Sequence, residues 1–468
     1  MTVGEFARQV LENLPYTPTD QQVQAVGALA RFCRTSAPSD SCFLLCGYAG
    51  TGKTSMAGAL VRALHVAGVP TVLLAPTGRA AKVFAAYSGF PASTVHRKIY
   101  WPPAMGKPFS AVMDNTHSHT VFIVDEASMI GSGTDGTELL SDLIHYVYTG
   151  RGCRLILMGD TAQLPPVGCD DSPALNPDTI RSYGLRVSRV QLTDTVRQAR
   201  SSGILYNATR LRRGMRRDPL EAPRLYFRGF DDVIPLPGEE LEETLSDLYA
   251  EDGLDETVIV TRANWRATQF NLAVRSQILG HEEELVRDEL LLVAKNNYHW
   301  SSTVRELDFI ANGDTARVVR LYGIEHKYGF RFADVRLAFP YRSVELDCKI
   351  ILDCLTADAP ALTAEMQQEL LQAIYNDPAL FSQYTPHGVR MKALRTNPHY
   401  QALQVKYAYA VTCHKAQGGQ WTNVVVDTAG VAADALTTLD FHRWLYTATT
   451  RATLRLFYLN PFTSDLEE

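Results

Sequence analysis

The chain has 468 residues, which is enough for two to four domains with buried cores. Hydrophobic residues make up 46% of it and charged residues 21%, as in ordinary globular proteins, and no apolar stretch is long enough to span a bilayer. The formal net charge is −6, so a nucleic-acid partner would require a local basic channel rather than an overall positive charge.

The eight cysteines are scattered, with no C-x-x-C pair, and several fall within apparent strands. This pattern favours reduced, mostly buried thiols over zinc ligands or disulfides. The first residues show no basic segment followed by a hydrophobic one, so we expect no secretory signal. Together these features predict a cytoplasmic protein that does not enter a membrane.

Strands and helices alternate over the first 190 residues. A capped amphipathic helix is expected over Pro18–Cys33, and a short apolar strand over Cys42–Cys46. Three further apolar strands follow at Thr71–Ala75, Val121–Val124 and Arg154–Met158. This alternation predicts a parallel sheet covered by helices on both faces.

A second α/β pattern begins near Gln191 and is interrupted by a region of a different kind. Its expected strands are Thr257–Val260, Val405–Val411, Thr422–Val426 and Arg455–Leu459, with helices over Asn264–Leu279 and Asp440–Arg451. The interruption holds strand-like runs separated by turns, namely Leu290–Ala294, Thr315–Val319, Phe332–Leu337 and Val344–Leu352, and then a helix over Thr363–Tyr375. We therefore predict a small all-β insertion within the second α/β domain.

The octapeptide Gly47–Thr54 follows the strand Cys42–Cys46 and opens a helix, which is the context of a phosphate-binding P-loop. Backbone N–H groups at such a turn form a concavity for anions, and the helix N-terminus adds partial positive charge. Lys53 would reach the β- and γ-phosphates, and the Thr54 hydroxyl would bind Mg²⁺. The motif predicts a nucleoside triphosphate site.

Two adjacent acids, Asp125 and Glu126, end the strand Val121–Val124. Successive side chains of a strand point to opposite faces, so the two carboxylates can perform different tasks. We expect Asp125 to hold Mg²⁺ and Glu126 to orient and deprotonate the attacking water.

The next strand leads into Gly159–Gly168, whose neutral Gln163 is suited to sense a γ-phosphate. Two arginines, Arg197 and Arg451, are candidates for stabilising the charge that develops on the γ-phosphoryl group. Each arginine alone would be interpreted as a surface ion pair, and only the surrounding motifs favour the catalytic role.

The order of these motifs resembles that of the superfamily 1B helicases of the RecD and phage Dda type. Further matching segments are Ala75–Lys82, Ser93–His96, Asp125–Met129, Val196–Gln198, Thr412–Gly418 and Tyr446–Arg451. The resemblance runs from about residue 17 to residue 459. It implies two RecA-like P-loop domains with parallel sheets, a short β-hairpin pin and a small SH3-like all-β insertion.

The resemblance assigns roles to single residues around the nucleotide. It places Gln22 on the adenine, and Gln163, Arg197 and Arg451 on the γ-phosphate. ATP contacts are expected from Gln22, Gly47, Ala49, Gly50, Thr51, Gly52, Lys53, Thr54, Gly418 and Gln420, and Mg²⁺ contacts from Thr54 and Asp125. The segment Gly418–Gln420 departs from the Gly-Ser-Glu of relatives, which weakens a ribose contact without threatening ATP hydrolysis.

A track for single-stranded DNA is also implied. It would consist of Pro76, Thr77, His96, Thr261, Arg262, Asn264, Thr412, His414 and Lys415. For Thr261, Arg262 and Asn264, a helix cap and its first turn explain the sequence nearly as well. The run Arg210–Arg217 could face a duplex, although a solvated helix end explains it better.

An insertion between His96 and His119 holds the candidates for a pin that splits the duplex. Trp101 or Phe109 would cap the last base pair, unless both pack onto the parent domain. Residues 357–400 occupy the place of an extension that braces the pin in phage Dda.

The expected domains are 1A (1–96 and 119–190), the pin 1B (97–118), 2A (191–284 and 403–468) and 2B (285–402). The resemblance implies a monomeric, Mg²⁺-dependent ATPase that moves 5′→3′ on single-stranded DNA and opens duplexes at single-strand/duplex junctions. An RNA-directed helicase, or a nucleotide-switched DNA-binding module that does not unwind, would also carry many of these features.

Overall fold

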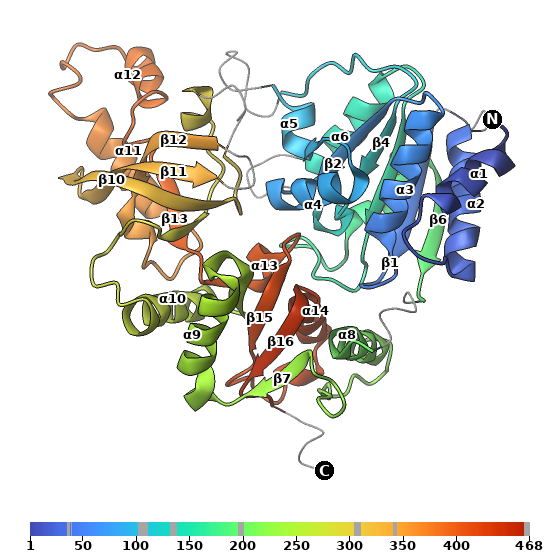
Figure 1. Cartoon of the computed structure of the whole chain (residues 1–468). Coiled ribbons are helices and arrows are strands. Elements are labelled where there is room, and N and C mark those ends of the chain that lie inside the picture. The colour runs from blue at the N-terminus through green and yellow to red at the C-terminus, as the bar shows by residue number, and fades with distance from the viewer. Residues whose placement is uncertain are drawn as a thin grey trace.

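The computed structural model describes residues 1–34, 38, 40–101, 111–131, 138–194, 201–303, 310–339 and 344–462. Three bodies are visible in Figure 1: an N-terminal α/β domain, a second α/β domain below it, and a β-barrel with attached helices beside both. Arg197 and Phe109, both predicted site residues, lie outside the described residues.

The first domain, 1A, is built on a six-stranded parallel sheet with the order β3-β2-β4-β5-β1-β6. Its strands are β1 (Ser41–Gly47), β2 (Thr71–Ala75), β3 (Ala92–Thr94), β4 (Val121–Val124), β5 (Arg154–Gly159) and β6 (Arg186–Leu192). Its helices are α1 (Val3–Glu12), α2 (Asp20–Arg34), α3 (Lys53–Val66), α4 (Gly78–Ser88), α5 (Val95–Ile99), α6 (Leu139–Thr149) and α7 (Pro177–Ser182).

Helices cover both faces of this sheet, as the apolar strands predicted. In β1, Phe43 and Leu45 pack against α1, α2 and α3, whereas Cys42, Leu44 and Cys46 pack against α5, α6 and α7. A strand buried on both faces needs apolar residues at every position, which explains the uninterrupted run at β1. The loops at the carboxyl ends of the strands are therefore held by a rigid core.

The second domain, 2A, has a five-stranded parallel sheet with the order β14-β8-β15-β16-β7. Its strands are β7 (Val233–Leu236), β8 (Thr257–Thr261), β14 (Ala410–Thr412), β15 (Trp421–Asp427) and β16 (Ala452–Leu459). Its helices are α8 (Gly203–Gly214), α9 (Leu241–Asp252), α10 (Asn264–Ala273), α13 (Cys413–Ala416) and α14 (Leu439–Thr449). The two parallel sheets confirm the predicted pair of RecA-like domains.

The predicted all-β insertion is a closed barrel of five strands. Its strands are β9 (Leu290–Val293), β10 (Thr315–Lys327), β11 (Phe330–Phe339), β12 (Val344–Ile351) and β13 (Leu403–Tyr407), and α11 (Ala364–Tyr375) and α12 (His387–Leu394) follow β12. The turn at Tyr328 and Gly329, both with positive φ, joins β10 to β11. The closed barrel is the architecture expected of an SH3-like insertion.

The single strand predicted over Val405–Val411 is wrong, because the chain divides there between two sheets. β13 pairs with β9 and β12 in the barrel, and β14 pairs with β8 in domain 2A. Buried Tyr407 and Tyr409 lie on either side of the transition, in one core that joins the barrel to domain 2A. An apolar run shows that a strand is buried, but not which sheet it joins.

Seven of the eight cysteines are buried and Cys169 is half-buried. In the part of the chain that the structure describes, we find no helix with the length and apolarity that crossing a bilayer requires.

Candidate functional site: a cleft between two P-loop-type domains

The P-loop lies between the carboxyl end of β1 and the first turn of α3. Gly50 and Gly52 have φ values of 71° and 79°, a backbone conformation that residues other than glycine rarely adopt. A Cβ on Gly52 would also lie 2.1 Å from the Tyr16 hydroxyl, so glycine is required there for space as well. The predicted glycine-rich turn is therefore built as a phosphate cradle needs to be.

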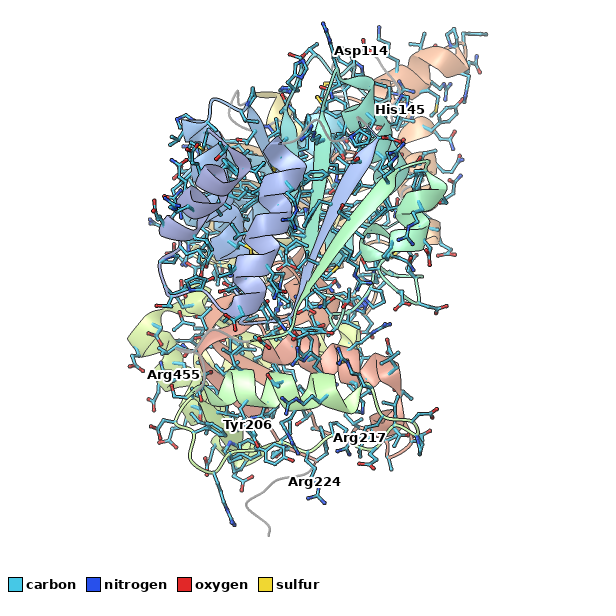
Figure 2. All side chains as sticks on the ribbon, turned by 90° about the vertical axis from the view of Figure 1, so that its right-hand side faces the viewer. Asp114, His145, Tyr206, Arg217, Arg224 and Arg455 are labelled. Carbon is cyan, nitrogen blue, oxygen red and sulfur yellow. The ribbon has the colours of Figure 1, made fainter. Side chains whose placement is uncertain are left out.

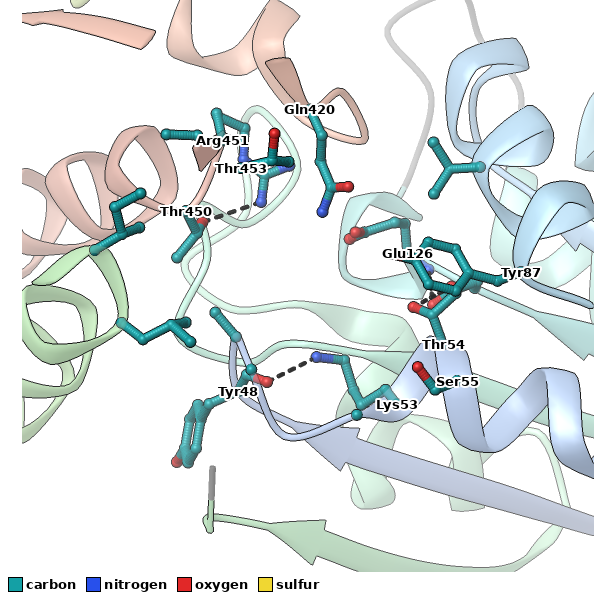
Figure 3. Close-up of a pocket in the computed structure, with 18 of the residues that line it drawn as sticks. Tyr48, Lys53, Thr54, Ser55, Tyr87, Glu126, Gln420, Thr450, Arg451 and Thr453 are labelled. Carbon is teal, nitrogen blue, oxygen red and sulfur yellow. Dashed lines mark hydrogen bonds between the residues drawn. The ribbon is translucent and has the colours of Figure 1, made fainter. Parts of the chain in front are cut away.

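A cavity of about 730 Å³ opens over the P-loop and extends to domain 2A. Domain 1A contributes Gly52, Lys53, Thr54, Asp125, Glu126 and Gln163, and domain 2A contributes Gly418, Gln420, Thr450 and Arg451. Figure 3 shows Lys53, Thr54 and Glu126 on one side of this cavity and Gln420 and Arg451 on the other. Residues more than 390 positions apart in the sequence thus meet at one cleft.

Lys53, at the start of α3, donates a hydrogen bond from Nζ to the carbonyl oxygen of Tyr48, at 3.1 Å. Its ammonium group therefore lies across the mouth of the P-loop, where a β- or γ-phosphate would replace this carbonyl as its partner.

Asp125 and Glu126 follow each other at the end of β4, and both line the cavity. The Asp125 carboxylate is buried and accepts a 3.1 Å hydrogen bond from the Thr54 hydroxyl. Burial, and then the nearby Glu126 charge, raises the pKa of Asp125 to about 6. Glu126 has a left-handed backbone, with φ of 51°, and is half-buried at the cavity wall. An unusual backbone conformation of this kind is typical of functional sites.

Thr54 and Asp125 have the chemistry that a magnesium ion requires. A hydroxyl oxygen and a carboxylate are hard oxygen ligands, and they are already in contact beside the P-loop. A divalent cation between them would favour the ionised form of Asp125, which burial alone disfavours.

Gln163 lines the cavity although it is 6% exposed, and its Oε1 atom has no hydrogen-bond partner among the described residues. A buried polar atom without a partner is costly, and a ligand in the cavity would supply one. This environment fits the predicted sensing of a γ-phosphate.

Arg451 lines the cavity but is anchored within its own domain. Its guanidinium group donates to the carbonyl oxygens of Thr447 and Gly419, at 3.0 and 3.2 Å, and to the Thr450 hydroxyl at 3.1 Å. Among the described residues, its side chain makes no hydrogen bond to domain 1A. Movement of domain 2A toward the P-loop would be needed to bring it to a phosphate.

Gln22 does not line the cavity. Its side-chain amide donates to the Thr51 carbonyl at 2.8 Å and to the Tyr16 hydroxyl at 3.3 Å, so it links α2 to the P-loop. Tyr16 and Tyr87 line the cavity instead and offer aromatic rings. Neither tyrosine was singled out from the sequence, because no motif marks them.

Several hydrogen bonds cross from one α/β domain to the other beside the P-loop. The Tyr446 hydroxyl accepts from the Ala49 amide at 2.9 Å and donates to the Asp160 carboxylate at 2.5 Å. Leu164 lies next to this contact, where its amide donates to the Thr447 hydroxyl at 2.9 Å and its carbonyl accepts from Gln417 at 2.7 Å. Sequence reasoning missed Tyr446 and Asp160, although both lie inside motifs it had recognised.

The residues predicted for the DNA track gather at the carboxyl ends of neighbouring strands in each domain. In domain 1A, β2 and β3 are in register at Ala75 and Thr94, which places Pro76 and Thr77 beside the helix that carries His96. In domain 2A, Thr261 and Thr412 are register partners at the ends of β8 and β14.

The track residues of domain 1A and those of domain 2A approach each other next to the barrel. Thr77 and Lys415 line one small hollow together with Gly313 of the barrel region. A Cβ on Gly418 would lie 3.0 Å from the Thr77 hydroxyl, so domains 1A and 2A nearly touch at this point. The Lys415 ammonium donates to Asn312, and burial lowers its pKa to about 8.

The remaining track residues have mixed environments. Thr261 is buried and donates to the Ala263 carbonyl at 3.1 Å, whereas Asn264 begins α10 and is half-buried. Arg262 and His414 are exposed. The neighbouring Trp265 is 51% exposed and offers a ring for base stacking that the sequence reasoning had not considered.

The two ends of the predicted pin insertion are paired. Tyr100 and Val112 form an antiparallel bridge, and the Trp101 amide donates to the Ala111 carbonyl at 3.0 Å. Trp101 is half-buried at this base. The intervening residues 102–110 lie outside the described part of the chain.

Known protein families match the parts of the chain that form the two sides of the cleft. Residues 19–226 match the AAA domain family, and residues 407–458 match the UvrD-like helicase C-terminal domain family. The ATP-dependent RecD2 DNA helicase of Deinococcus radiodurans is 33% identical over 171 residues, which are 36% of this chain. The chain spans only 22% of that relative's length.

Solved structures of Pif1 helicases align with most of the chain, at low sequence identity and with TM-scores below 0.5. The Pif1 helicase from Bacteroides, in complex with ADP-AlF3 and ssDNA, is 16% identical, with 95% of this chain and 92% of that chain covered and a TM-score of 0.47. The Pif1 helicase from Candida albicans is 15% identical, with coverage of 95% and 94% and a TM-score of 0.45.

The two family models match separate parts of the chain, one around the P-loop and the other at the end of domain 2A. Both matches agree with the resemblance to superfamily 1B helicases that the order of the motifs indicates.

Proposed function

We propose that this chain is an ATP-dependent DNA helicase that moves 5′→3′ along single-stranded DNA and unwinds duplexes at single-strand/duplex junctions. The observation that carries the proposal is the cavity in which the P-loop and Glu126 of domain 1A meet Arg451 of domain 2A. The name of its curated relative, an ATP-dependent DNA helicase, supports DNA as the substrate. The 5′→3′ direction rests on the resemblance to superfamily 1B.

ATP binds with its phosphates in the P-loop, where the amides of Ala49 to Thr54 and the Lys53 ammonium neutralise their charge. Thr54 and Asp125 would hold Mg²⁺, which when bound neutralises charge on the β- and γ-phosphates. Tyr16 and Tyr87, which line the cavity, would contact the adenine. Gln22 supports this site from behind, through Thr51 and Tyr16.

Hydrolysis uses both walls of the cleft. Glu126 orients the attacking water and accepts its proton, while Gln163 contacts the γ-phosphate. Arg451 and Arg197 stabilise the negative charge that accumulates during phosphoryl transfer. Because Arg451 is held within domain 2A, ATP brings it into place by drawing the two domains together.

Closing and opening of the cleft would move the protein along the DNA, because each of the two domains carries some of the track residues. Pro76, Thr77 and His96 move with domain 1A, whereas Arg262, Thr412, His414 and Lys415 move with domain 2A. A strand gripped alternately by the two groups advances once per ATP cycle. The pin, through Trp101 or Phe109, would separate the duplex ahead of the motor, which acts as a monomer.

The test is the rate of ATP hydrolysis with and without single-stranded DNA, for the wild type and for Glu126→Gln. We expect strong stimulation of the wild type by DNA and little hydrolysis by the variant, which still binds ATP. An ATPase that DNA does not stimulate would contradict the proposal.

Two alternatives predict different results. An RNA-directed helicase would be stimulated more by an RNA oligonucleotide than by DNA of the same sequence. A nucleotide-switched binding module would change its DNA affinity with ATP but displace no strand. Glu126 and Arg451, placed in one cavity, favour a protein that hydrolyses ATP quickly over such a switch.

A further inference from the structure

Domain 2A carries a concentration of arginines on an otherwise acidic chain. Residues 203–232 contain seven arginines, no lysine and four carboxylates, whereas the whole chain has a net charge of −6. One of these carboxylates, Asp232, is occupied in capping α8, where it accepts from the Gly203 amide at 2.7 Å. The local charge is therefore positive and calls for an anionic partner.

The arginines divide between two sides of α8 and the turn that follows it. Arg212 stacks 4.0 Å from the Tyr48 ring centroid, and Arg216 donates to the Tyr48 hydroxyl at 2.9 Å, so both face the P-loop. Arg210, Arg213 and Arg217 follow one another at helical spacing on another side and are exposed. Only the first set contacts a residue of the P-loop.

Beside the exposed set lies a pocket of about 360 Å³. Arg210, Arg213, Arg217 and Arg224 line it, and Glu221 is the single carboxylate among its described lining residues. Glu221 is paired with Arg217. His442 also lines this pocket; its Nε2 lies 3.0 and 3.1 Å from two carbonyl oxygens, and its buried Nδ1 has no partner among the described residues. The lining of the pocket thus holds more guanidinium groups than carboxylates.

Aromatic rings continue the same surface. Tyr206 is 40% exposed and lies four residues before Arg210 on α8. Its ring meets Tyr226 edge-on, with centroids 5.4 Å apart, and Arg210 donates to the Tyr226 hydroxyl at 2.9 Å. We call Tyr206, Arg210, Arg213, Arg217, Arg224 and Tyr226 together the α8 patch.

We propose that the α8 patch is a second binding site for single-stranded nucleic acid, separate from the track between the domains. Guanidinium groups suit phosphodiester oxygens because their planar donors bind two oxygens at once. Single strands are held by such donors in a groove together with aromatic rings on which bases stack. The patch offers both features, since its arginines line a pocket and its tyrosines lie beside them.

The position of the patch makes it distinct from the track. Figure 1 shows α8 on the side of domain 2A opposite to the barrel and α10. Figure 2 looks at that side and shows Tyr206, Arg217 and Arg224 at the lower part of domain 2A, away from the domain 1A sheet. A strand that leaves the track would have to pass around domain 2A to reach them, so only a long strand would occupy both sites.

The test compares oligonucleotide lengths. Binding of oligothymidylates of about 10 nucleotides, the size of one groove, and of about 40 nucleotides is measured without ATP over a range of salt concentrations. We expect Arg213→Glu/Arg217→Glu to weaken binding of the long strand about tenfold and to reduce its salt slope by about 1.4, since each phosphate contributes about 0.7. Binding of the short strand stays within about twofold of the wild type, because the track is intact.

The control is Arg8→Glu/Arg151→Glu, which makes the same change of charge at exposed positions of domain 1A. A second variant, Tyr206→Ala, removes one stacking ring and should weaken the long strand about fivefold while sparing the short one. Thermal unfolding checks that each variant is folded.

The inference rests on the proposed function only in taking nucleic acid as the ligand. If the wild type bound neither oligonucleotide, the proposed function would fail. If it bound both and the patch variants matched the control, the α8 patch would be excluded as a binding site. The long strand is expected to bind more tightly than the short one because it also reaches the α8 patch. If polyglutamate abolished this difference as effectively as single-stranded DNA does, the proposal would also be overturned, because the patch would then bind anions in general.

Discussion

The two walls of the cleft are organised in different ways. On domain 1A, Lys53, Thr54 and Asp125 are held by short-range contacts at the edge of one sheet, with Thr54 already bonded to Asp125. On domain 2A, Arg451 makes its three hydrogen bonds within its own domain. In the function that we propose, the first wall binds the nucleotide as it stands, whereas the second has to move before it acts on one. Catalysis would then depend on a movement of domains.

The largest expected effect comes from the wall that must move. Arg451→Ala should lower the kcat for DNA-stimulated ATP hydrolysis by about 10³-fold, the lower end for arginines that stabilise phosphoryl transfer, while ATP binding changes little. Steady-state kinetics and equilibrium binding of ATP measure the two quantities. Arg455→Ala, which breaks ion pairs of domain 2A with Glu251 and Asp252, is the control. A loss confined to ATP affinity would show that Arg451 already contacts the nucleotide in the open cleft.

On the domain 1A side of the cleft, Glu126→Gln should lower the kcat for ATP hydrolysis by about 10²- to 10⁴-fold, which is the range for a general base. The affinity for ATP should change little. Removing this charge leaves the P-loop and the Thr54–Asp125 contact in place. Single-turnover hydrolysis measures the chemical step, and Glu242→Gln on the exposed side of α9 serves as the control. Near-normal single-turnover hydrolysis would exclude Glu126 as the base.

An intermediate effect on DNA-stimulated ATP hydrolysis is expected from loss of the Tyr446 contact, which joins domain 2A to domain 1A. Tyr446→Phe removes the hydroxyl that joins Ala49 to Asp160. It leaves the buried Asp160 carboxylate and the partly buried Ala49 amide without this partner. We expect the stimulation of ATP hydrolysis by DNA to fall about tenfold, with the KM for ATP within about twofold of the wild type. Tyr458→Phe loses a comparable buried hydroxyl contact, but within domain 2A. Equal effects of both variants would indicate loss of stability rather than of coupling.

The sequence predicted the domain 1A side of the cleft better than the contacts that cross the cleft to domain 2A. Gly47–Thr54, Asp125 and Glu126 lie in local motifs whose backbone geometry follows from adjacent residues, and the structure brings them together. The link from Ala49 to Tyr446 spans 397 positions and depends on how two domains dock. Gln22 reaches the site only through Tyr16 and Thr51, a detail of packing that no spacing rule encodes.

The same limit applies to the fold. Hydrophobic runs identified the strands of both parallel sheets, because strands buried on both faces are apolar throughout. They did not show that the chain leaves the barrel after Tyr407 and enters the domain 2A sheet at Ala410. Pairing partners depend on contacts far apart in the sequence, and both candidate sheets bury the same kind of side chain.

The smallest expected effect concerns pH and the track. Burial lowers the pKa of Lys415 to about 8, so its ammonium is charged at pH 7 and largely neutral at pH 9. Single-stranded DNA should therefore bind about two- to threefold more weakly at pH 9, with a salt slope lower by about 0.7, the loss of one phosphate contact. Lys415→Met should show neither change. A wild-type slope that is the same at both pH values would place Lys415 outside the track.

The most direct test of the account is strand displacement on two duplexes that differ only in the polarity of their single-stranded tail. With ATP and Mg²⁺, the account predicts that the chain opens the duplex with a 5′ tail and leaves the 3′-tailed duplex closed, and that Arg451→Ala opens neither. Opening of the 3′-tailed duplex alone would contradict the direction of movement. Hydrolysis of ATP without opening of either duplex would contradict the claim that closing of this cleft drives unwinding.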